Sequence, residues 1–177
     1  ASTMLLDIGP DVNATLTNLT VQNGRNTNVG NANGGAMFFH PGNGHTLTLE
    51  STTFRGNVND GDWGGVMRLE FAWSFGPLPS LVINRSVFED NTLNGTGGGG
   101  VFDLDSSATI TDTVFRNNTA VIARGGAIIS DHEYDAIFTR CRFLGNTAGQ
   151  SGGAVYNLSL IHISEPTRLR RISYAVF

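Results

Sequence analysis

Residues 99–128 read GGVFDLDSSATITDTVFRNNTAVIARGGAI, and this stretch decides the fold. It begins and ends with a pair of glycines that is followed by a small or apolar pair of residues. Between the two glycine pairs lies the motif Phe-x-x-Asn, at Phe115 and Asn118. Both motifs recur along the chain in strict alternation, once each per roughly 26 to 35 residues. A period of this length is typical of solenoids, in which each repeat is one unit of a stack.

The two motifs define five repeats. The glycine pairs are Gly34-Gly35, Gly64-Gly65, Gly99-Gly100, Gly125-Gly126 and Gly152-Gly153. The other motif occurs at Phe54/Asn57, Phe88/Asn91, Phe115/Asn118 and Phe143/Asn146, with a degenerate version at Val21/Gly24. Apolar and polar residues alternate around each Phe with one bend, which indicates two short strands there and a third after each glycine pair. We therefore expect a coil with three faces.

The predicted fold class is all-β: a right-handed parallel β-helix (solenoid) of about five rungs, incomplete at both ends. Equivalent residues of successive rungs should form columns about 4.8 Å apart. The motif phenylalanines are expected to stack inside. The motif asparagines are expected at a corner, in the left-handed conformation that Asn tolerates and with amides hydrogen-bonded from rung to rung. The glycine pairs should supply positive φ angles and allow close approach of the backbone.

The repeat also carries a family resemblance. Gly125-Gly126-Ala127-Ile128, alternating with Phe-x-x-Asn, resembles the repeat of the polymorphic outer-membrane-protein family, within the pectin-lyase-like superfamily of right-handed β-helices. The resemblance covers about residues 14–157. Members of this family are surface autotransporters and adhesins. The resemblance therefore implies a secreted or cell-surface location, including the outer membrane.

The composition shifts abruptly after Asn157, where the pattern rich in Gly, Asn and Thr stops. The last twenty residues, LSLIHISEPTRLRRISYAVF, resemble the conceptual translation of a transposase-type sequencing adapter, with its variable index at Leu169 to Arg171. We accordingly divide the chain into a β-helix fragment at residues 1–157 and a non-native tail at residues 158–177. The alternative is a native C-terminal strand or helix.

Composition narrows the functional classes. The net charge is −4 and no basic stripe with interleaved aromatic residues is present, which argues against a nucleic-acid partner. No apolar run is long enough to be a transmembrane segment. The single cysteine, Cys141, excludes an internal disulfide. It falls in the column of Thr52, Ser86 and Thr113, so we interpret it as a small buried residue rather than a reactive thiol.

One acidic cluster is a candidate metal site. After each glycine pair, the outward positions are Phe38, Arg68, Asp103, Ile129 and Tyr156, followed two residues later by His40, Glu70, Asp105 and Asp131. Glu70, Asp105 and Asp131 are thus predicted to form one column, with Asp103 and Arg68 alongside. Carboxylates about 5 Å apart repel each other unless they bind a cation or one is protonated, which suggests a weak Ca²⁺ site at most. The alternative, a solvated acidic surface, is favoured.

A second group of oxygen ligands, in Asn59-Asp60-Gly61-Asp62, has the composition of an ordinary turn. No catalytic residue is predicted, because β-helix lyases combine their acidic cluster with an Arg or Lys base, and only Arg68 is near this one. We predict a structural or adhesive role with no cofactor other than weakly bound Ca²⁺. The expected partners are cell-surface glycans or surface proteins of a host or neighbouring cell. The alternatives are a polysaccharide-active, pectate-lyase-like enzyme and a non-catalytic carbohydrate-binding module.

Overall fold

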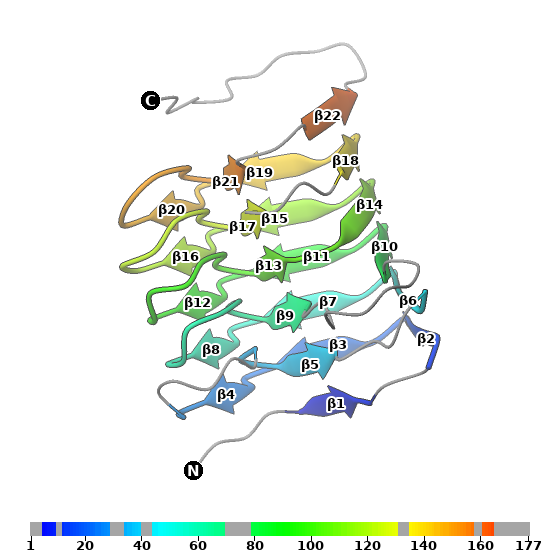
Figure 1. The fold of residues 1–177 in the computed structure, drawn as a ribbon, viewed down its shortest axis with the longest axis horizontal. Helices are drawn as coiled ribbons and strands as arrows, with labels where there is room; N and C mark the ends of the chain where they lie inside the picture. The colour runs from blue at the N-terminus through cyan, green and yellow to red at the C-terminus, as the bar shows by residue number, and fades with distance from the viewer. Residues whose placement is uncertain are drawn as a thin grey trace.

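A computed structural model describes residues 5–9, 12–28, 34–39, 44–69, 79–130, 135–157 and 161–164. These residues form strands, bends and turns, with no helix among them. The strands belong to four parallel sheets, and each sheet takes every fourth strand in chain order. Figure 1 shows the resulting stack of coils, with the sheets forming its walls.

The four sheets are defined as follows. The first sheet contains β1 (Leu6–Ile8), β5 (Met37–Phe39), β9 (Met67–Leu69), β13 (Phe102–Leu104), β17 (Ile128–Ser130) and β21 (Val155–Asn157). The second contains β2 (Ala14–Thr17), β6 (Thr46–Glu50), β10 (Ser80–Asn84), β14 (Ser107–Thr111), β18 (Ala136–Thr139) and β22 (Ile161–Ser164). The third contains β3 (Thr20–Gln22), β7 (Thr53–Arg55), β11 (Val87–Glu89), β15 (Val114–Arg116) and β19 (Arg142–Leu144). The fourth contains β4 (Arg25–Asn26), β8 (Val58–Asn59), β12 (Thr92–Leu93), β16 (Thr119–Ala120) and β20 (Thr147–Ala148).

The prediction of a right-handed parallel β-helix is confirmed. The chain passes through the second, third, fourth and first sheets in turn, and this four-strand unit occurs five times. The number of faces, however, was predicted wrongly. Each repeat has four strands rather than three, because the chain bends once more before the motif Asn and then forms a further two-residue strand.

Both bends are made by single residues with a left-handed backbone. The first bend lies between the second and third sheets, at Asn18, Ser51, Arg85, Asp112 and Arg140, all with φ between 49° and 54°. The second bend is the residue before the motif Asn, at Asn23, Gly56, Asp90, Asn117 and Gly145. The expectation that the motif Asn itself is left-handed is therefore wrong. Its side chain instead lies in the interior, and the preceding residue makes the bend.

The motif phenylalanines stack in the core as predicted. Successive ring centroids are 5.3, 5.1 and 4.9 Å apart along the column Phe54, Phe88, Phe115 and Phe143. The planes of adjacent rings differ by 6° to 12°, so the rings are nearly parallel. Val21 occupies the same column in the first repeat. Burial of each full ring stabilises the coil by roughly 1.5–3 kcal/mol.

The motif asparagines form a buried ladder beside this column. The side-chain amide Nδ2 of Asn57, Asn91 and Asn118 donates to Oδ1 of the next Asn at 2.9 Å. Each Nδ2 also donates to a backbone carbonyl of the preceding rung, as from Asn118 to Phe88 at 3.0 Å. Because buried amides cost free energy unless they are paired, the ladder specifies the register of neighbouring rungs.

The two glycines of each pair have different structural roles. The first glycine has a positive φ at Gly64, Gly99, Gly125 and Gly152. The second lies directly against the following rung: a Cβ on Gly100 would be 2.1 Å from the carbonyl oxygen of Gly126. The first position thus needs conformational freedom, whereas the second excludes any side chain.

Part of the predicted tail takes part in the described structure. The backbone of β22 pairs in parallel with β18 and adds a sixth strand to the second sheet. Residues 158–160 and 165–177 lie outside the described residues. Within the described chain, no helix has the length and apolar character needed to cross a bilayer.

Candidate functional site

The outer face of the first sheet carries the side chains that the sequence placed there. Phe38, Arg68, Asp103, Ile129 and Tyr156 occupy one register position on successive strands. Asp103 and Ile129 are nevertheless buried. Ile129 is covered by the turn that precedes the third glycine pair, since a Cβ on Gly98 would be 2.4 Å from its Cδ1 atom. This turn therefore folds over the outside of the coil.

Two of the four predicted metal ligands are described, and both lie next to Arg68. Its Nε atom is 3.7 Å from Oδ2 of Asp103, and its Nη2 atom is 3.9 Å from Oδ2 of Asp105. Glu70 and Asp131 lie outside the described residues, so the predicted column remains a prediction. Among the described residues, no three acidic, His or Cys side chains converge as a metal site would need. The single positive charge of Arg68 offsets part of the charge of the two carboxylates.

The Asn59-Asp60-Gly61-Asp62 segment forms a hydrogen-bonded turn. Oδ1 of Asn59 accepts from the backbone N–H of Gly61 at 2.8 Å, and its Nδ2 donates to the carbonyl of Trp63 at 2.7 Å. Asp60 accepts from Nδ2 of Asn94 at 2.7 Å and pairs with Arg25 at 2.9 Å. The hydrogen bond from Asn94 contributes most to holding the pKa of Asp60 below its usual value. The ordinary-turn interpretation accounts for these contacts.

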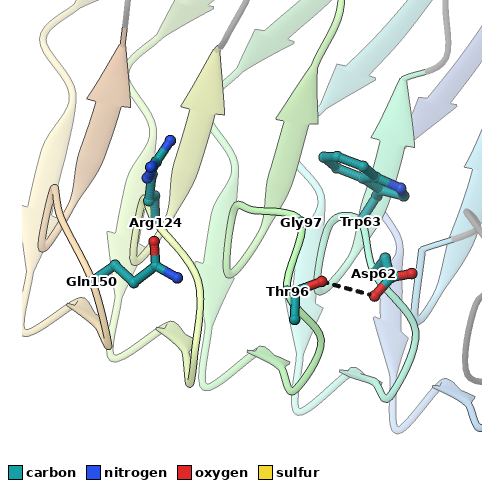
Figure 2. A pocket seen from close by; sticks show the side chains of 6 residues that line it. All are labelled: Asp62, Trp63, Thr96, Gly97, Arg124 and Gln150. Atoms are coloured by element: carbon teal, nitrogen blue, oxygen red, sulfur yellow. Dashed lines mark hydrogen bonds between the residues drawn. The ribbon is translucent and has the colours of Figure 1, made fainter.

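The sequence did not reveal a hollow of about 400 Å³ beside this turn. It is lined by Asp62, Trp63, Thr96, Gly97, Arg124 and Gln150, which come from four successive rungs (Figure 2). Trp63, Gly98 and Arg124 are consecutive partners in parallel bridges, so they stand one above another in the stack. The middle rung has a glycine at this position, against which the Ile129 side chain packs, and its neighbour Gly97 lines the hollow between the indole and the guanidinium.

Contacts outside the hollow support both of its ends. The guanidinium of Arg68 lies over the Trp63 ring at 5.2 Å, and that of Arg124 lies over the Tyr156 ring at 5.0 Å. Such cation–π contacts restrict the orientation of both partners. Gly97 lies against the indole, where a Cβ would be 2.5 Å from Cε3. The glycine is therefore required for the ring to occupy this position.

Polar groups complete the walls. Oγ1 of Thr96 donates to Oδ1 of Asp62 at 3.2 Å, and Nε2 of Gln150 donates to the carbonyl of Ile122 at 2.8 Å. These six residues offer hydrogen-bond donors, acceptors and one aromatic surface. They include a single carboxylate, which accepts the Thr96 hydroxyl, and no histidine, cysteine or lysine, so the arrangement is suited to binding.

A comparison of the repeats could have found this hollow. The residue before each glycine pair differs in all five repeats, at Asn33, Trp63, Gly98, Arg124 and Ser151. The two motifs contain the residues that recur, whereas a site on a solenoid is made from residues that differ between rungs.

The chain is similar to an autotransporter. It is 31% identical over 149 residues to the probable autotransporter YfaL of Escherichia coli (strain K12). The match covers 76% of this chain but only 12% of the relative. No protein-family model matches the chain, and no solved structure matches it. The specific repeat family named from the glycine and Phe-x-x-Asn motifs therefore stays a prediction.

Proposed function

We propose that this chain is a segment of a secreted or cell-surface β-helix protein with a structural and adhesive role. The observation that carries the proposal is the uniform parallel stack, in a chain that is similar to an autotransporter. The similarity agrees with the surface location that the repeat resemblance implies. The chain corresponds to only a small part of that relative. The role of the complete protein is therefore part of the proposal.

The outer surface is well suited to a durable scaffold. Ion pairs join neighbouring rungs on the outside, between Arg85 and Glu50, Arg116 and Glu89, and Arg140 and Asp112. An exposed pair adds little to stability, about 0–1 kcal/mol, but all three pairs, including that of the buried Glu89, favour the same rung-to-rung register. Inside the coil, the buried Asn ladder and the Phe column favour the same register of neighbouring rungs. A long rigid rod can therefore form with one cysteine and no internal disulfide.

The main alternative is a polysaccharide-active enzyme. A lyase needs a base that can lose its proton beside the substrate, and an arginine stays protonated in nearly all protein environments. Arg68 is moreover held between Asp103 and Asp105. The contacts of Arg68 therefore support a binding or structural role over lyase chemistry.

The location is tested with antibodies raised against the purified chain and applied to intact cells of the source organism. We expect labelling without permeabilisation and loss of the signal after brief protease treatment of whole cells. Labelling that requires permeabilisation would contradict the proposal. A cytoplasmic protein labelled in parallel controls for membrane leakage.

The adhesive role is tested separately, with beads coated with the purified chain. We expect these beads to attach to host or neighbouring cells and soluble chain to compete for attachment. Beads coated with heat-unfolded chain are the control. Equal attachment of both bead types would contradict adhesion by the folded coil.

A further inference from the structure

The hollow in Figure 2 has the features of a site for one charged sugar ring. Adjacent parallel strands lie about 4.8 Å apart, so the backbones that carry Trp63 and Arg124 are separated by about 10 Å. Gly98 stands between them, and Figure 2 shows the indole and the guanidinium on the two sides of Gly97. The gap is thus bounded by an aromatic surface at one end and a cation at the other.

Arg124 is exposed and available to a ligand. Among the described residues, no carboxylate forms an ion pair with it, and its guanidinium lies over the Tyr156 ring. Planar guanidinium groups bind carboxylates through two parallel hydrogen bonds, which makes a carboxylate a better match than a neutral group. Because the ring of Tyr156 supports the guanidinium, part of its orientation is set before a ligand arrives.

The other end of the hollow suits sugar hydroxyls. The Thr96 hydroxyl donates to Oδ1 of Asp62, which leaves Oδ2 of this lining residue as a second acceptor. The part of the half-buried Trp63 indole that Arg68 and Gly97 leave uncovered supplies an apolar surface against which the C–H groups of a pyranose can lie. The anionic Asp62 and the cationic Arg124 are on rungs two and four, so a ligand with one carboxylate has one favoured orientation.

We propose that this hollow binds a carboxylate-bearing pyranose of a glycan, with the carboxylate on Arg124, the ring against Trp63 and a hydroxyl on Asp62. The inference rests on the proposed adhesive function and specifies one ligand class for it. Two kinds of sugar present this chemistry, namely sialic acids and hexuronic acids. No bond is made or broken, since the six lining residues only bind.

Binding can be followed through the fluorescence of Trp63. The chain has two tryptophans, so replacing the other one, Trp73→Phe, makes Trp63 the only reporter. The full chain carrying Trp73→Phe is titrated with 3′-sialyllactose, with a hyaluronan tetrasaccharide and with lactose as the neutral control. We expect at least one carboxylated sugar to change the Trp63 emission and to bind about tenfold or more tightly than lactose, because only it adds charge-assisted hydrogen bonds.

Two variants distinguish the proposed contacts from general charge effects. Arg124→Gln should reduce the affinity for the carboxylated sugar to that for lactose, whereas Arg142→Gln should leave it unchanged. Arg142 is a matched control because it is an exposed arginine on β19, in the third sheet. Thermal unfolding of each variant confirms that the coil is intact. A further variant, Trp63→Ala, is assayed by calorimetry and should lose all binding.

Several outcomes would overturn the inference. These are the absence of binding by both carboxylated sugars, equal binding of lactose, or equal effects of Arg124→Gln and Arg142→Gln. If the antibodies still label intact cells and the beads still attach, the proposed function survives and only the sugar site is lost. If labelling and attachment fail while the sugar binds, the hollow is a sugar site in a protein with a different role.

Discussion

Gly100 stands where a side chain would collide with the next rung. Its Cβ would be 2.1 Å from the Gly126 carbonyl, whereas a Cβ on Gly153, the second glycine of the last pair, has its nearest neighbour at 3.7 Å. We expect Gly100→Ala to lower the free energy of unfolding by about 1–3 kcal/mol or more, since the rungs must separate locally. Gly153→Ala should change it by less than about 0.5 kcal/mol. Urea unfolding of both variants, followed by circular dichroism, checks this, and equal effects would contradict it.

Cys141 is a second position where the surroundings decide the behaviour of a residue. The thiol is half-buried and donates to the carbonyl of Ile110 at 3.3 Å. Burial, the largest influence, raises its pKa above the usual value. Less thiolate is therefore present near pH 8, and any stability gained from the neutral thiol is lost as the pH rises through the raised pKa.

This predicts slow modification of the folded chain by a disulfide reagent at pH 8. The rate should be lower than that of a free thiol because less thiolate is present and burial limits access, and unfolding in guanidinium should restore the rate of a free thiol. The time course of absorbance gives both rates, and Cys141→Ser, which removes the only thiol, sets the background. A folded chain that reacts as fast as the unfolded one would indicate an activated thiol instead.

At the scale of elements, the Phe column joins the strands of the third sheet. The Phe115 ring on β15 stacks between Phe88 on β11 and Phe143 on β19. Phe115→Ala removes both contacts and leaves a cavity, so it should cost roughly 3–5 kcal/mol of unfolding free energy. Leu144→Ala, one residue beyond the column and exposed on the surface, should cost less than about 0.5 kcal/mol. Chemical denaturation measures both, and a loss below about 1 kcal/mol for Phe115→Ala would be inconsistent with a filled core.

At the scale of the whole molecule, the tail at residues 158–177 contributes the strand β22 but neither of the two repeat motifs. The backbone of β22 extends the second sheet beyond β18, as expected when an open parallel edge meets any following chain. We predict that a chain ending at Asn157 has the same urea midpoint as the full chain. Resequencing the source transcript with a different library chemistry should also fail to return the last twenty residues. Recovery of the same residues would contradict the adapter interpretation.

The acidic residues beside Arg68 also bear on calcium binding and on lyase activity. Because Arg68 lies between Asp103 and Asp105, a calcium ion would have to compete with a resident cation. We predict a Ca²⁺ affinity no tighter than millimolar by calorimetry. We also predict no unsaturated products, by ultraviolet absorbance, from polygalacturonate or alginate with or without Ca²⁺. Calcium-dependent product formation that Asp105→Ala abolishes would establish the enzyme alternative.

The sequence by itself determined what repeats. Phe115, Asn118 and Gly100 could be assigned to columns because parallel stacking places the same position of each repeat at the same place in every rung. The period of the motifs therefore specified the core, the ladder and the glycine contacts. It did not specify the fourth strand, since the second bend is formed by Gly in some repeats and by Asn or Asp in others, and no single residue type marks it.

Only the tertiary structure decided what the outer surface does. Asp103 is buried although its strand position points outward, because Arg68 and a folded-over turn surround this face. The ends of the hollow are likewise formed by Trp63 and Arg124, dissimilar residues about sixty positions apart that bridges to Gly98 bring into one stack. A periodic pattern encodes the geometry common to all rungs. The site is formed by residues that differ between rungs, and these residues can act together only when stacking brings them side by side.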